Sequence, residues 1–139
     1  MTWIIFALLA AVFAALVAIF GKVGISGIDS TLATSIRAVV MAVFLVLTSL
    51  FLGKAHLLPT VESKTLLFII FSGIAGALSW LFYFFALKYG PASGVAALDR
   101  LSVVFVIILA ALFLGEGITW KSGIGAALIT AGAVFMVLK

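Results

Sequence analysis

The sequence predicts an all-α membrane protein with five transmembrane helices, and three observations support this fold class. Of the 139 residues, 67% are hydrophobic and 9% are charged, whereas a soluble domain is about half apolar and about a quarter charged. Five apolar stretches each approach the ~20 residues that a helix needs to cross a ~30 Å hydrocarbon core. These stretches do not alternate polar and apolar residues, as the strands of a membrane barrel do.

The five stretches form one predicted domain, 1–139, with spans near residues 3–21, 31–52, 66–87, 95–114 and 120–138. The first span lacks a basic leader and four more follow, so we expect a retained helix and not a signal peptide. Asp29 and Ser30 are good N-caps for the second span. Gly90-Pro91 signals a turn before the fourth. The connection 115–119 is so short that the last two spans must be antiparallel neighbours.

The reactive side chains available are few. The chain has no cysteine and one histidine, His56, in a predicted loop. Disulfides and thiolate metal sites are therefore excluded, and we expect no catalytic triad, metal site or cofactor, and no enzyme. The net charge of +4 is spread out without a basic run, so we expect no nucleic-acid partner.

The distribution of lysines gives no clear orientation in the membrane. The face that carries the N-terminus has three lysines and the opposite face has three: Lys54, Lys64 and Lys121 against Lys22, Lys88 and Lys139. Orientation normally follows an excess of Lys and Arg in cytoplasmic loops. Two interpretations stay open. Either another feature fixes one orientation, or copies insert both ways (dual topology) and pair as an antiparallel dimer.

Three charged residues lie inside the predicted spans: Arg37, Asp99 and Arg100. Intramembrane charge is expensive, at about 3 kcal/mol or more, and persists where it is paired or functional. Arg37 and Asp99 lie very roughly 6–9 Å inside the same membrane boundary, so they can form a pair. Two roles stay open for this pair. It acts as a gate or proton site, or it is a purely structural clamp. On an ideal helix Arg100 points about 100° away from Asp99 and is expected to snorkel toward the headgroups.

Polar residues recur at helical spacing around these charges. Ser30, Thr34 and Arg37 share one face of the second span, Ser72, Gly76, Ser79 and Tyr83 share one face of the third, and Asp99 and Ser102 share one face of the fourth. We expect a translocation pathway lined by Arg37, Ser79, Tyr83, Asp99, Arg100 and Ser102. For Ser72, Gly76 and Ser79, close helix packing is the favoured alternative. Trp80 is assigned to lipid in preference to a substrate groove.

Small residues at fourfold spacing mark the first and last spans. The sets are Ala7, Ala11 and Ala15, then Ala10, Ala14 and Ala18, and finally Gly123, Ala127 and Ala131. Such faces favour helix–helix contacts. An oligomer interface on the last span is consistent with this pattern.

The combined pattern resembles the EamA family of the drug/metabolite transporter superfamily in its short, single-repeat form. The residues that carry the resemblance are Asp29-Ser30, Ala33-Thr34, Arg37, Gly76, Leu78-Ser79-Trp80, Tyr83, Ala86-Leu87, Gly90, Ala92-Ser93, Asp99-Arg100-Leu101-Ser102, Leu114-Gly115-Glu116, Thr119 and Gly123. The resemblance implies one half of an inverted-repeat transporter. A single unit would pair with a second copy, in an antiparallel homodimer, or with a paralogous five-helix subunit. Many full-length members have a proline near the position of Val103, which this chain lacks. The first span also lacks the acidic residue that small multidrug resistance proteins use as proton carrier.

The resulting hypothesis is a secondary transporter that moves a small metabolite or drug-like solute by alternating access in a prokaryotic inner membrane. Asp99 is the candidate proton site, and Arg37 or Arg100 the candidate for an anionic substrate group. The alternatives are a passive channel formed by a dual-topology dimer and a non-transporting scaffold or partner subunit.

Overall fold

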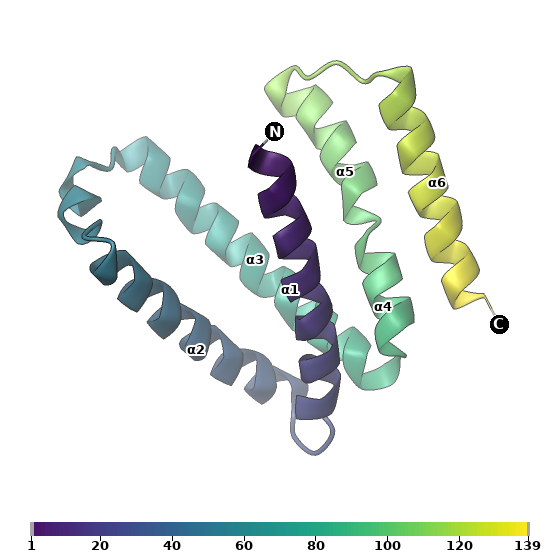
Figure 1. The fold of residues 1–139 in the computed structure, drawn as a ribbon, viewed down its shortest axis with the longest axis horizontal. Coiled ribbons are helices and arrows are strands. Elements are labelled where there is room, and N and C mark those ends of the chain that lie inside the picture. Colours follow the sequence, from purple (N-terminus) through teal and green to yellow (C-terminus); the bar gives the residue numbers. More distant parts are fainter. Residues whose placement is uncertain (1, 139) are drawn as a thin grey trace. The chain divides into compact units, whose positions relative to one another are not determined.

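The computed structural model describes residues 2–138, and within that range it contains helices and no strand (Figure 1). The elements in chain order are α1 (Thr2–Gly24), α2 (Ser30–Phe51), the 3₁₀ turn η1 (Ala55–Thr60), α3 (Ser63–Tyr89), α4 (Ala92–Asp99), α5 (Ser102–Leu109), the π-helical turn η2 (Ala110–Leu114) and α6 (Trp120–Val137). Met1 and Lys139 lie outside the described residues, so the place of Lys139 in the lysine count stays a prediction.

Within residues 2–138, five segments are long and apolar enough to cross a membrane: α1, α2, α3, the run Ala92–Leu114 and α6. The predicted fold class is therefore confirmed. The helix ends differ from the predicted ones by a few residues. The largest extension is in α3, which has 27 residues and a length of about 40 Å. A helix of this length exceeds the hydrocarbon core and places Lys64 and Lys88 at its two ends.

The fourth predicted span, 95–114, falls within the run Ala92–Leu114, although that run is not one regular α-helix. The segment begins earlier, at Ala92, directly after Pro91, and the α-helix is interrupted at Arg100 and Leu101. There the amides of Arg100, Leu101, Val103 and Val104 donate to carbonyls three residues back, which is the tighter 3₁₀ pattern. The amide of Ser102 has no backbone acceptor among the residues that the structure describes. No proline or glycine marks this interruption in the sequence.

Residues 22–88 form one compact unit, which consists mainly of α2 and α3 joined through η1. Asp29 caps α2 as predicted, because its carboxylate accepts hydrogen bonds from the amides of Thr31 (2.8 Å) and Leu32 (3.1 Å). Lys22 donates a hydrogen bond to the carbonyl of Leu87 in the last turn of α3. A cation at a helix C-terminus also complements the helix dipole.

The second unit comprises residues 1–21 and 89–139. In it α6 packs along α4 and α5, which confirms that the last two spans are neighbours. Gly94 of α4 faces α6, since a Cβ placed there would lie in van der Waals contact, 3.7 Å from Cγ2 of Val137. On α6 the buried small residue is Ala133, while Gly123, Ala127 and Ala131 are exposed. The small-residue face predicted for this span is thus left open for another helix.

Candidate functional site

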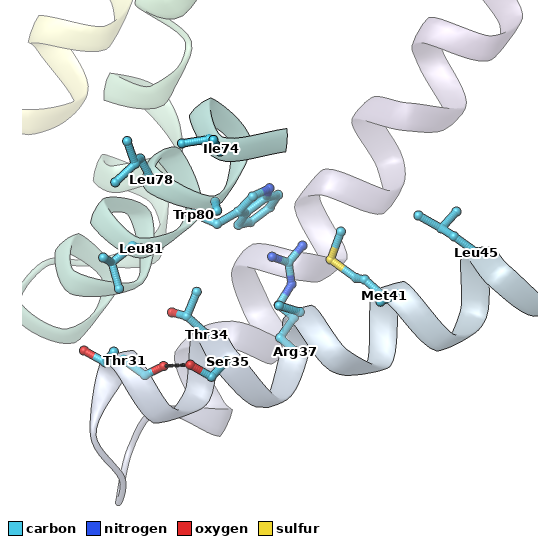
Figure 2. A pocket seen from close by; sticks show the side chains of 13 residues that line it. Thr31, Thr34, Ser35, Arg37, Met41, Leu45, Ile74, Leu78, Trp80 and Leu81 are labelled. Atoms are coloured by element: carbon cyan, nitrogen blue, oxygen red, sulfur yellow. Dashed lines mark hydrogen bonds between the residues drawn. The ribbon is translucent and has the colours of Figure 1, made fainter. Parts of the chain in front are cut away.

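A groove of about 570 Å³ lies between α2 and α3 within the unit 22–88 (Figure 2). Its α2 wall includes Thr31, Thr34, Ser35, Arg37, Met41 and Leu45, and its α3 wall includes Ile74, Leu78, Trp80 and Leu81. Small-molecule sites commonly have volumes of about 300–1,000 Å³ and mostly apolar walls with a few polar groups. The groove matches that description, with Arg37 as its one charged side chain.

Arg37 projects from α2 toward the indole ring of Trp80 on α3 (Figure 2). Its guanidinium carbon, Cζ, lies 3.5 Å from the centroid of the Trp80 ring and 5.7 Å from that of Phe84. This is a cation–π contact, in which the negative face of the ring attracts the cation. The contact holds the cation in the groove, and no residue that the structure describes accepts a hydrogen bond from the guanidinium.

Two neighbouring rings on α3 support Trp80. The Trp80 and Tyr83 rings lie 5.4 Å apart with an interplanar angle of 72°, and the Trp80 and Phe84 rings lie 6.4 Å apart at 66°. Both contacts are edge-to-face, a favoured geometry for aromatic pairs. The spacing of three and four residues places these side chains on one side of α3. The indole is therefore positioned before any ligand arrives.

The hydroxyl groups of the groove are already used as donors. Thr34 donates to the carbonyl of Ser30 at 2.8 Å. Ser35 donates to the carbonyl of Thr31 at 2.9 Å (Figure 2). Each hydroxyl keeps oxygen lone pairs that can accept a hydrogen bond. The Arg37 guanidinium is consequently the strongest donor that the groove offers to a ligand.

Asp99 and Arg100 lie at the interruption between α4 and α5, in the other unit. An Asp99 carboxylate oxygen lies 3.8 Å from a guanidinium nitrogen of Arg100, and the two side chains are 38% and 54% exposed. Arg100 keeps helical backbone angles (φ −67°, ψ −13°), and its long side chain still reaches toward the Asp99 carboxylate. The contact is long and open, so it does not lock the Asp99 carboxylate.

The predicted site residues do not all meet at one place. Arg37 lines the groove and Tyr83 contacts Trp80, but Ser79 is exposed and lies outside the groove lining, and Ser102 is exposed at the start of α5. The Arg37–Asp99 pair would join residues of the two units, and it stays a prediction.

Trp80 was assigned to lipid in preference to a groove, but its ring contacts Arg37 and lines the groove. A signal for this was present. Trp80, Tyr83 and Phe84 recur at helical spacing opposite the one charged residue of the second span. Residues 2–138 contain no cluster of three or more His, Cys, Asp or Glu side chains that could hold a metal ion.

The sequence profile of the EamA-like transporter family matches residues 1–138. The chain belongs to this family. A protein from Sinorhizobium sp, described as an uncharacterized transporter in the cobO 3′ region, is 43% identical over 137 residues, which cover 99% of this chain and 97% of the relative. No solved structure gives a significant match. The EamA-like resemblance is confirmed, and with it a transport role for this multi-pass membrane protein.

Proposed function

We propose that two copies of this EamA-like chain form a secondary transporter that moves a small metabolite or drug-like solute by alternating access. The observation that carries the proposal is Arg37, an ionised side chain inside a membrane span that is held on Trp80 in a groove. Ionisable groups at this depth are costly and mark transport pathways by default. We place the transporter in the cytoplasmic membrane of a prokaryote.

The number of candidate spans supports a dimer. Alternating-access transporters commonly contain two repeats of inverted topology with the substrate site at the repeat interface. This chain has five spans and a single repeat, so a second copy in the opposite orientation would supply the other half. The exposed face of Gly123, Ala127 and Ala131 on α6 suits close packing against another helix. A paralogous five-helix subunit could take the same place.

We propose that Arg37 and Asp99 act as a gate. Helix α2 begins at Ser30 and α4 begins at Ala92. Arg37 and Asp99 each come seven residues later, and thus about 10 Å from the start of the helix. The two depths match, and the open contact with Arg100 leaves Asp99 free to change partner. The gate is closed when the two residues are paired and open when they separate. Asp99 would carry the proton if transport is proton-coupled.

The test is uptake by proteoliposomes that contain the purified protein. The vesicles are incubated with a metabolite extract under a pH gradient, and their contents are analysed by mass spectrometry. We expect wild-type protein to concentrate a solute, and the Asp99→Asn and Arg37→Ala variants to lose this concentrative uptake. Lys54→Gln is the matched control, since it removes a cation from the exposed loop between α2 and α3.

The possible results distinguish the gate, the passive channel and the scaffold function. Normal uptake by both the Asp99→Asn and Arg37→Ala proteins would exclude the gate. Equilibration of the solute without concentration would identify a passive channel. Uptake by neither the homodimer nor a complex with a paralogous chain would leave the scaffold function.

A further inference from the structure

We infer that the groove between α2 and α3 binds an amphipathic organic anion: a carboxylate attached to an apolar body. The inference rests on the proposed transport function and specifies its substrate class. It follows from the charge balance inside the spans, from the geometry of Arg37 and Trp80, and from the chemistry of the groove walls.

The charge balance leaves Arg37 without a counter-ion in its own unit. The acidic residues of the unit 22–88 are Asp29 and Glu62, which lie outside the spans, before α2 and before α3. Asp99 has Arg100 within 3.8 Å in the other unit. Arg37, Asp99 and Arg100 together carry one net positive charge inside the membrane. An anionic ligand would neutralise this charge each time the Arg37–Asp99 gate is open.

The geometry leaves Arg37 ready to bind. The guanidinium carbon lies over the Trp80 ring, 3.5 Å from its centroid, as in a stacked pair, and no hydrogen bond from Arg37 is found among the residues that the structure describes. Stacking leaves the planar N–H edge open, and this edge matches the two oxygens of a carboxylate. The indole fixes the orientation of that edge, so little side-chain freedom is lost when an anion binds.

The walls of the groove favour an apolar body for the part of the ligand beyond the carboxylate. Beyond Arg37 toward the middle of α2 the lining is apolar, with Met41 and Leu45 on one side and Ile74 and Leu78 on the other. The Thr34 and Ser35 hydroxyls donate their protons to helix carbonyls, so they can only accept hydrogen bonds from a ligand. A fully polar anion would lose its hydration against this surface without compensation. An apolar tail gains from burial there.

Intrinsic fluorescence of Trp80 gives a direct test on the full-length protein. The chain has three tryptophans, so a Trp3→Phe/Trp120→Phe background leaves Trp80 as the sole indole. The probes are three ligands of equal size: 3-phenylpropionate, 3-phenylpropanamide and 3-phenylpropylamine. We expect the carboxylate to change the Trp80 fluorescence saturably and to bind about 10- to 100-fold more tightly than the amide, as a charge-assisted hydrogen bond would. The amine should bind more weakly than the amide.

Variants of Arg37 then assign the effect to the guanidinium. Arg37→Gln should reduce the affinity for 3-phenylpropionate to that for the amide, and Arg37→Lys should retain an intermediate affinity. Lys54→Gln, which removes a cation from a loop, should bind like the parent protein. Should Arg37→Gln fail to fold, the comparison of the three ligands on the parent protein decides the question alone. Equal binding of all three ligands, or unchanged carboxylate binding by Arg37→Gln, would overturn the inference.

Proteoliposome uptake separates this inference from the proposed function. Binding of 3-phenylpropionate without uptake of any solute would support the anion site and contradict transport. Concentrative uptake of a neutral or cationic solute that 3-phenylpropionate does not inhibit would support transport and contradict the anion site.

Discussion

The indole ring of Trp80 determines where the only charge of the groove is placed. Its centroid lies 3.5 Å from the guanidinium carbon of Arg37, and Tyr83 and Phe84 brace it edge-to-face. Without the ring, the Arg37 side chain would be free to extend along α2 toward the headgroups. The effect of Trp80 on an anionic ligand is therefore indirect: it positions the group that binds.

Replacing Trp80 by leucine should weaken 3-phenylpropionate binding about 2- to 30-fold, which corresponds to a cation–π contact of about 0.5–2 kcal/mol. Trp80→Phe should lose less, because a smaller ring face remains. Isothermal titration calorimetry measures this affinity without relying on the fluorescence of Trp80, which these variants lack. Trp120→Leu is the matched control, since Trp120 is exposed at the start of α6. An affinity of Trp80→Leu equal to that of the control would exclude the positioning role.

At the residue scale, the sequence predicted the charged members of the candidate site and missed the ring that holds one of them. An arginine within an apolar stretch is visible from composition alone. The partner of that arginine is not, because a long side chain can reach several positions on a neighbouring helix. Ser79 is the opposite case, a residue that was predicted to line the site and does not line the groove. It shares a helical face with Tyr83 by spacing, yet it is exposed, because the groove follows the adjacent face of α3.

At the scale of single elements, α2 depends on its cap. Hydrogen bonds from the amides of Leu32 and Thr31, together with the nearby charge of Lys88, keep the pKa of the Asp29 carboxyl below its usual value. A carboxyl with a lowered pKa in the folded state stabilises the fold fully above the pKa of the unfolded chain. That contribution is lost as the pH falls through the lower pKa of the folded state.

We therefore expect Asp29→Ala to lower the melting temperature in micelles at neutral pH by a few degrees, and Asp29→Asn to lower it less, since asparagine also caps helices. Below the lowered pKa of Asp29, the wild-type and Asp29→Ala melting temperatures should converge. Melting curves from neutral pH to below the lowered pKa of Asp29 test this directly. A gap between the two proteins that stays constant down to the lowest pH would contradict a charge-dependent cap.

The interruption between α4 and α5 is the element that the sequence did not predict. Apolar length identifies the span, but helix breaks are usually signalled by proline or glycine, and neither occurs between Val95 and Leu114. Asp99 and Arg100 stand next to each other, and in a continuous helix they would point in different directions. An Asp99 oxygen and an Arg100 nitrogen nevertheless lie 3.8 Å apart beside the interruption. Adjacent opposite charges inside an apolar span are thus the one sequence feature that accompanies the break.

At the scale of the whole molecule, the five spans and the capped start of α2 were predictable, since apolar length and capping chemistry are local properties. The association of two chains is not local. It depends on which way each copy inserts, and the lysines divide three to three between the two membrane faces. A balance this even leaves orientation sensitive to a change of one or two charges.

Charge engineering should consequently fix the orientation. The Leu58→Lys/Thr60→Lys variant adds two cations to η1, between α2 and α3, and should insert with that face in the cytoplasm. Ser26→Lys/Ser93→Lys adds two on the opposite face and should insert the other way round. A reporter fused to the C-terminus, active on one side of the membrane only, measures the orientation. The matched glutamine variants should keep the orientation of the wild type, whether it is single or mixed.

Antiparallel pairing then makes a prediction that a parallel dimer does not share. Each lysine variant expressed alone should lose concentrative uptake, because all of its copies face one way and no inverted partner is present. Co-expression of the two variants should restore uptake, since each supplies the orientation that the other lacks. The contradicting result is a wild type with a single orientation, together with normal transport by the lysine variant of that same orientation expressed alone. The functional dimer would then be parallel. The arrangement in which the Arg37 and Asp99 sites of two inverted copies lie near opposite membrane faces would be excluded.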